Sequence, residues 1–270
     1  MQVYRELRVL TARPDDDALA RAPHHLYGVV PAAERCSAGR WRGMAMEAIA
    51  ASRVPIVTGG TGLYLKALME GLSRIPPIPE PIRDSVRARV ARDGAEAAHA
   101  ALSQNDPISA ARISPGDAQR ITRALEVLEA TGKPMSEWRG GDGATEMRFL
   151  TIRLAPPREA LYAACDARFS RMIARGAAAE VRGLLALGLD PSLPAMKALG
   201  VREIAACLRG EASLAEACAA GHKSTRNYVK RQETWFRHQL AAAVTLSTPK
   251  PEPVFAAVDR FLAGVPEAAR

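Results

Sequence analysis

The stretch that decides the fold reads Val54-Pro55-Ile56-Val57-Thr58-Gly59-Gly60-Thr61-Gly62-Leu63-Tyr64. Its apolar, β-branched beginning predicts a buried strand over residues 54–58, and the apolar residues that follow at helical spacing predict a helix. A strand, a glycine-rich turn and a helix start favour a bound phosphate, because backbone N–H groups and the helix dipole point at it. An ordinary tight turn is the alternative; the Thr61 hydroxyl favours a ligand site.

Size and charge narrow the classes of protein to consider. The 270 residues, 48% of them hydrophobic, suffice for one large α/β domain or a core with a smaller module. No apolar run reaches membrane-spanning length and the first residues lack the apolar centre of a secretory signal, so we expect a cytoplasmic protein without a membrane partner. The net charge of +8 favours a polyanionic partner, although coding bias also produces arginine-rich chains.

The cysteines and histidines give no metal-binding pattern. The four cysteines are scattered without CxxC spacing, which indicates neither a disulfide framework nor a zinc site. His24 and His25 are adjacent, and adjacent side chains diverge on a helix or a strand. We therefore expect no metal ligands among these side chains.

The order of elements predicts an α/β core interrupted by a helical insertion. A proline-dense segment at residues 75–81 marks a border, and residues 82–93, 95–104 and 117–131 have helical patterns. After a glycine-rich return at residues 140–143, the strand pattern resumes at 148–154. The predicted core comprises residues 1–73 and 146–270, and the insertion residues 74–145.

The second half of the chain is expected to be helical, with one further strand. A long helix at residues 158–187 is expected to kink or divide at Gly176, and a helix at 213–240 to break near Gly221. A short strand at 243–246 and a helix at 254–262 follow.

Two predicted helices carry clustered cations. Arg120 and Arg123 are three residues apart on the helix at 117–131. On the helix at 213–240, four spaced cations form one stripe: Lys223, Arg226, Lys230 and Arg237. Such a stripe suits an RNA backbone or a diphosphate, and a solvated surface helix is the alternative.

Seven stretches together resemble one family, the tRNA dimethylallyltransferases or IPP transferases. The matching stretches are residues 1–4 (MQVY), 23–26 (PHHL), 37–39 (SAG), 59–64 (GGTGLY), 117–126 (DAQRITRALE), 200–203 (GVRE) and 225–237 (TRNYVKRQETWFR). They occur in family order over nearly the whole chain, which is far more specific than any one of them.

The resemblance implies a fold, a reaction and partners. The fold is an α/β core like that of P-loop nucleotide kinases, with a parallel sheet and a helical insertion that grips the tRNA anticodon stem-loop. The reaction transfers a dimethylallyl group from dimethylallyl diphosphate to N6 of the adenine next to the anticodon, assisted by Mg²⁺. A monomer is implied. The adenine must leave its stack, the amine must lose a proton, and the departing diphosphate must be stabilised.

The resemblance also implies roles for particular residues. Thr61 and Arg202 would be catalytic, at the reaction centre and on the diphosphate. The residues implied to bind the diphosphate or tRNA are Gln2, Gly59, Gly60, Gly62, Arg83, Gln119, Arg120, Ile121, Thr122, Arg123, Lys197, Gly200, Lys230, Arg231, Gln232, Trp235 and Arg237.

One departure from the family pattern changes the expectation for activity. In the family, a GxTxSGKS phosphate loop and an Asp-Ser pair, whose Asp is the general base, precede the stretch that matches residues 1–4. The chain starts at Met1 and contains no GxxxxGK[ST] pattern. We therefore expect an N-terminally truncated chain without its first strand, phosphate loop or base, which transfers no prenyl group.

Two explanations for the start and three for the function stay open. Met1 is either an internal methionine of a longer functional protein or the start of a gene that has lost its 5′ end. The leading function is the transferase activity; a non-catalytic tRNA-binding remnant and a structural helical protein are the alternatives. A nucleotide kinase is disfavoured, because the phosphate loop and paired acids are missing.

Overall fold

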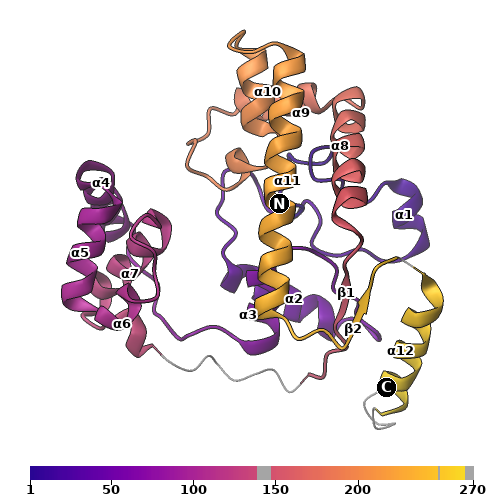
Figure 1. Ribbon diagram of the computed structural model, residues 1–270, viewed down its shortest axis with the longest axis horizontal. Helices are drawn as coiled ribbons and strands as arrows, with labels where there is room; N and C mark the ends of the chain where they lie inside the picture. Colours follow the sequence, from indigo (N-terminus) through magenta and orange to yellow (C-terminus); the bar gives the residue numbers. More distant parts are fainter. Residues whose placement is uncertain (139–146, 249, 265–270) are drawn as a thin grey trace. The chain divides into compact units, whose positions relative to one another are not determined.

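The computed structural model describes residues 1–138, 147–248 and 250–264 and divides into two compact units (Figure 1). One unit joins residues 1–69 to residues 148–270, and the other spans residues 70–147. These borders lie close to those predicted for the core and the insertion. The expected glycine-rich return at residues 140–143 lies outside the described residues.

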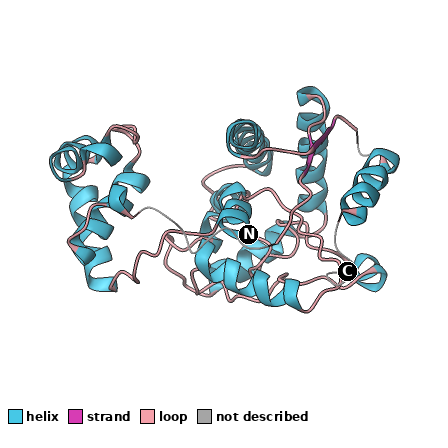
Figure 2. Ribbon diagram, turned by 90° about the horizontal axis from the view of Figure 1, so that it is seen from below, coloured by secondary structure: helices cyan, strands magenta, loops and turns pink. Residues whose placement is uncertain are grey.

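The discontinuous unit is mostly helical (Figure 2). Its helices are α1 (Asp16–Arg21), α2 (Ala38–Ala50), α3 (Gly62–Glu70), α8 (Arg158–Ala174), α9 (Ala177–Ala186), the 3-10 turn η2 (Ala195–Lys197), α10 (Val201–Leu208), α11 (Leu214–Gln239) and α12 (Pro251–Ala263). Within the described residues, no helix combines the length and the apolar character that crossing a membrane requires.

A small parallel sheet accompanies these helices. Strands β1 (Ile152–Leu154) and β2 (Val244–Leu246) pair in parallel, with Ile152 opposite Val244, and a separate parallel bridge joins Tyr4 to Val30. The α/β class predicted from the sequence is confirmed, as is the strand at residues 243–246. The sheet that the described residues form is smaller than expected.

The strand predicted at residues 54–58 is not formed. This segment has no regular structure, and its apolar side chains are exposed, with Val54 54% and Ile56 82% accessible. A strand is stable only when a neighbouring strand takes up its backbone hydrogen bonds. Within the described residues no strand pairs with this segment, so its β-branched pattern has nothing to bury against.

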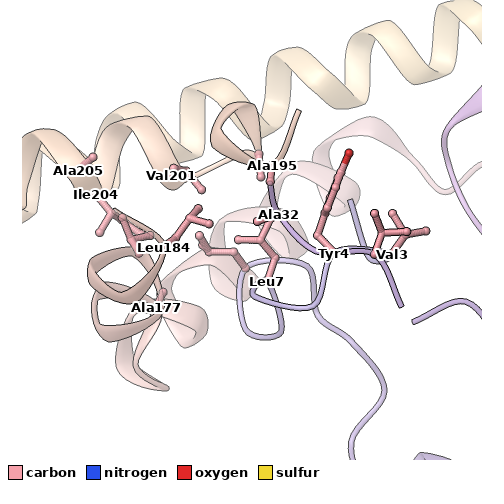
Figure 3. Packing of buried hydrophobic residues seen from close by; sticks show 14 of the residues in the cluster. Val3, Tyr4, Leu7, Ala32, Ala177, Leu184, Ala195, Val201, Ile204 and Ala205 are labelled. Carbon is pink, nitrogen blue, oxygen red and sulfur yellow. The ribbon is translucent and has the colours of Figure 1, made fainter. Parts of the chain in front are cut away.

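The core of this unit joins the start of the chain to helices α9 and α10. Figure 3 shows Leu7 beside Leu184 of α9 and Val201 of α10, three of the side chains buried in one cluster. The Glu180 carboxylate of α9 adds a polar anchor, because it accepts hydrogen bonds from the N–H groups of Arg8 (2.7 Å), Val9 (2.6 Å) and Leu10 (2.9 Å). The N-terminal segment is thereby fixed against α9.

Two glycines affect the long helices in opposite ways. Gly176 adopts φ 96° and separates α8 from α9, as expected from the sequence. The predicted break near Gly221 is wrong, because α11 runs unbroken from Leu214 to Gln239. A Cβ at Gly221 would lie 2.2 Å from the Phe169 ring of α8, so this glycine allows the close approach of α8 and α11.

The helical unit has a core of its own. Its elements are α4 (Glu80–Asp93), α5 (Ala95–Asn105), α6 (Pro107–Ala110), α7 (Ala118–Thr131) and the 3-10 turn η1 (Met135–Glu137). Helix α7 packs on α4 and α5 through Ile121, Ala124 and Leu125, and Val86 and Leu102 are fully buried opposite it. The Asp117 side chain caps α7 by accepting from the N–H of Arg120.

Candidate substrate site

The glycine-rich turn forms the entrance to α3. The carbonyl of Thr61 accepts hydrogen bonds from the N–H groups of Tyr64 (2.9 Å) and Leu65 (3.3 Å), and the Thr61 side chain is exposed. N–H groups at a helix start have no acceptor inside the helix, and the helix dipole is positive there. The turn can therefore receive an anionic group beside the Thr61 hydroxyl.

A hollow of about 700 Å³ lies beside this turn. It is bounded by residues 1–3, residues 22–27, helix α2 and residues 53–61. The polar residues of its lining include Gln2, His24, Arg53, Thr58 and Thr61. The Gln2 amide donates to the carbonyls of Thr11 (3.1 Å) and Ala12 (3.3 Å), so it holds a neighbouring loop.

The hollow does not supply the donors that a Mg²⁺ ion prefers. Mg²⁺ is usually held by one or two carboxylates together with phosphate oxygens and waters. No Asp or Glu is among the residues that line the hollow, and in the described parts of the chain no three His, Cys, Asp or Glu side chains gather into a cation-binding group. These residues therefore do not by themselves fit the implied ion.

Helix α11 lies against the turn through two side chains. The Gln232 amide donates to the Gly60 carbonyl at 2.8 Å. The Trp235 ring packs so closely on Gly62 that a Cβ there would lie only 2.2 Å from the nearest ring atom. Farther along, the Lys66 ammonium of α3 donates to the Gln239 side chain at 3.0 Å. The structure thus brings together Gly60, Gly62, Gln232 and Trp235, four of the predicted site residues.

The helix that follows the turn is fixed by aromatic side chains. The Tyr64 hydroxyl donates to the Cys36 carbonyl at 2.6 Å, and its ring stacks on Trp41 with centroids 5.1 Å apart. The Tyr4 hydroxyl accepts from the Cys36 N–H at 3.1 Å. Burial raises the pKa of the Tyr64 hydroxyl and of the Cys36 thiol above their ordinary values, so both groups are neutral at pH 7.

The cationic stripe of α11 is partly neutralised. Lys223, Lys230 and Arg237 are exposed, whereas Arg226 forms an ion pair with Asp166 of α8 at 2.7 Å. The Arg231 guanidinium lies over the Tyr228 ring, 5.7 Å from its centroid. Most of the stripe remains available to an anionic partner.

The second predicted catalytic residue lies on another element. Arg202 is exposed on α10, and it is not among the residues that line the hollow at Thr61. Lys197 in η2 is exposed as well. Gly200 is buried with φ 91°, and a Cβ there would lie 2.8 Å from Leu10 and 3.0 Å from Phe169, so it shapes the start of α10.

The predicted RNA-binding residues of the helical unit lie on α7 and α4. Gln119 and Arg120 are exposed, and Arg120 pairs with Asp117 at 3.5 Å. Arg83 lies 3.4 Å from Glu80, and Thr122 is half-buried. Ile121 is fully buried in the core, so its side chain supports α7 and is not presented to a ligand, contrary to the expectation from the sequence.

Glu126, which is not among the predicted site residues, organises two arginines of this unit. Its side chain is 7% exposed and lies 3.5 Å from both Arg87 of α4 and Arg123 of α7. A buried carboxylate between two guanidinium groups fixes their positions. The spacing of Arg123 and Glu126, one helical turn apart, was the only available signal.

Comparisons with known proteins identify relatives over nearly the full chain. Residues 2–239 match the family model described as IPP transferase. A tRNA dimethylallyltransferase of Rhodospirillum centenum is 57% identical over 250 residues, which cover 90% of this chain and 80% of the relative. The protein of the same name from Paramagnetospirillum magneticum is 50% identical over 264 residues, covering 96% of this chain and 84% of that protein.

Solved structures show the same fold. The full-length tRNA isopentenylpyrophosphate transferase of Bacillus halodurans matches with a TM-score of 0.64 and 29% identity, covering 97% of this chain and 84% of that one. A eukaryotic dimethylallyltransferase acting on tRNA matches with a TM-score of 0.82, covering 98% of this chain and 72% of that one. At 22% identity, this second match concerns the fold alone.

Proposed function

Because this chain belongs to the IPP transferase family, we propose that it transfers a dimethylallyl group from dimethylallyl diphosphate to N6 of the adenine next to the anticodon of tRNA. It would do so in the cytoplasm and as a monomer. The observation that carries the proposal is the family match over residues 2–239, supported by 57% identity to a relative named for this activity.

The site chemistry supports the diphosphate end of this reaction. The exposed Thr61 hydroxyl and the N–H groups at the start of α3 suit a diphosphate oxygen. The exposed cations of α11 suit the phosphates of an RNA. We assign Arg202 and Lys197 to the diphosphate, and the exposed polar residues of α7 to the anticodon stem.

The reaction makes one bond and breaks another. The N6 amine attacks C1 of the dimethylallyl group, and the C1–O bond breaks with its electron pair leaving on the diphosphate. One N6 proton passes to a base. The hollow at Thr61 has no carboxylate in its lining for that role. We keep a Mg²⁺ requirement as part of the proposal, with the diphosphate supplying ligand oxygens.

A non-catalytic tRNA-binding protein, which agrees with the expectation from the sequence that this chain transfers no prenyl group, is the second candidate. It is favoured by the exposed cations of α11, which suit an RNA backbone, and by the lack of a carboxylate in the lining of the hollow. The two candidates differ in one product, the prenylated adenine, and share RNA binding with strong salt dependence.

The test uses the purified 270-residue chain, labelled dimethylallyl diphosphate, Mg²⁺ and an anticodon stem-loop RNA. Label in the RNA supports the transferase, and an otherwise identical RNA with guanine at the target position is the control. RNA binding without label transfer supports the second candidate. No RNA binding at low salt contradicts both.

A further inference from the structure

Helix α11 and the glycine-rich turn meet along one face of the helix. Gln232, Trp235 and Gln239 are spaced by three and four residues, so their side chains lie on the same face. They contact Gly60, Gly62 and Lys66 in turn. The end of α11 therefore lies along the turn and the first part of α3, as the two helices do in Figure 1.

The Gln232 contact fixes the orientation of one peptide group. The Gly60 carbonyl and the Thr61 N–H belong to the same planar, trans peptide, so they point in opposite directions. A carbonyl held toward Gln232 at 2.8 Å directs the Thr61 N–H away from α11. Among the described residues this N–H has no hydrogen-bond partner, so it is available to a ligand.

The Trp235 contact limits how the turn can move. The indole ring stands 2.2–2.4 Å from the position of a Cβ on Gly62, so the backbone there lies directly on the ring. A rigid ring cannot retract as a flexible side chain can. The ring therefore supports the first residue of α3 and with it the adjacent Thr61.

We propose that Gln232 and Trp235 are positioning residues that hold the glycine-rich turn, so that the Thr61 N–H and hydroxyl meet the diphosphate of the prenyl donor. This assigns them to the turn instead of to tRNA contact. The inference rests on the proposed function for the identity of the ligand, whereas the clamp itself can be measured without catalysis.

The first arm of the test measures the turn directly, by hydrogen exchange at the Tyr64 and Leu65 amides, whose N–H groups are bonded to the Thr61 carbonyl. Gln232→Ala and Trp235→Ala should speed exchange there by about tenfold or more, because the peptide at residues 60–61 loses its support. Asn227→Ala is the matched control, an exposed amide on the same helix, and should leave the exchange unchanged. Unchanged exchange in both clamp variants overturns the proposal.

The second arm measures transfer. Gln232→Ala should lower kcat/KM for dimethylallyl diphosphate by about 10- to 100-fold while the tRNA KM stays within about twofold. Trp235→Phe should restore most of what Trp235→Ala loses. A rise in the tRNA KM with normal exchange in the turn would instead make Gln232 a direct RNA contact and overturn the proposal.

Substituting Gly62 in two backgrounds, native and Trp235→Ala, separates the clamp from a general folding defect. Gly62→Ala should speed exchange in the turn in the native background, because its methyl group meets the Trp235 ring. In the Trp235→Ala background the same substitution should add little. Equal effects in both backgrounds contradict the clamp. If the unaltered chain transfers no label, the proposed reaction fails, and the exchange arm still decides the clamp.

Discussion

Single contacts around α3 determine how firmly the site is held. The Tyr64 hydroxyl reaches the carbonyl of Cys36, and the Tyr4 hydroxyl meets the N–H of the same residue. One loop residue is thus held from both sides by phenol groups. The Tyr4 contact is buried and the Tyr64 contact is partly buried, so the loss of either leaves a shielded polar backbone group without this partner.

Tyr64→Phe should lower the free energy of unfolding by about 1–3 kcal/mol, because the Cys36 carbonyl loses its donor. Tyr162→Phe in α8 is the control, since its hydroxyl makes no hydrogen bond within the described residues; its effect should be close to zero. Urea unfolding followed by circular dichroism measures both. Equal losses in the two variants contradict the role given to the Tyr64 hydroxyl.

The same cluster should make stability fall at alkaline pH. Burial raises the pKa of Cys36 above its ordinary value of 9.0 and the pKa of Tyr64 above 10.0. The unfolded chain therefore releases these protons first, and the free energy of unfolding declines as the pH rises above about 9.

Urea titrations at pH 8, 9 and 10 measure this decline. Cys36→Ala should reduce the part of the decline that begins near pH 9. A decline that is identical with and without Cys36 would contradict the assignment.

At the scale of helices and strands, local patterns predicted some elements and missed others for identifiable reasons. Gly176 divides two helices as its sequence context indicates, because glycine adopts φ 96° without the steric cost that a side chain would add. Gly221 does not, because the Phe169 ring needs the space that a side chain would fill. The strand at 54–58 failed for lack of a pairing strand in the described residues, which a single segment cannot reveal.

The two kinds of helical glycine predict opposite mutational effects. Gly221→Ala should destabilise the protein by about 1–3 kcal/mol, because the new methyl group would press on the Phe169 ring. Gly183→Ala in α9 is the control, with nothing within 4 Å of its Cβ position, and should stabilise by about 0.5–1 kcal/mol through helix propensity. Thermal unfolding measures the stability of both variants. If both substitutions stabilise the protein, α8 can move away from α11, and the predicted clash with Phe169 is wrong.

At the scale of the whole molecule, the family was predictable from the sequence and the arrangement of the site was only partly so. Motifs such as GGTGLY are local, and they identified the turn. The contact of Gln232 with Gly60 joins residues 172 positions apart, and no local pattern specifies it. Glu126 was missed because its burial depends on how α4 packs on α7.

Arg123→Gln in the helical unit should weaken binding of an anticodon stem-loop at every salt concentration. It should also lower the slope of log K against log salt by about one, as expected for one lost phosphate contact. Arg92→Gln is the control, because Arg92 is an arginine of the same unit that is also ion-paired, with Asp93, but is not among the residues predicted to bind RNA. Fluorescence anisotropy at salt concentrations between about 50 and 200 mM measures the slopes of the two variants. Equal slopes argue against RNA contact at Arg123.

The Glu180 anchor has a consequence for the order in which the protein acquires its structure during synthesis. The N–H groups of residues 8–10 have no acceptor until the ribosome has added Glu180, about 170 residues later. At ordinary translation rates this delay is on the order of 10 to 30 seconds. In that interval the helical unit, whose chain is continuous, emerges complete with its own core. The segment around residues 8–10 thus lacks its anchor until α9 has left the ribosome.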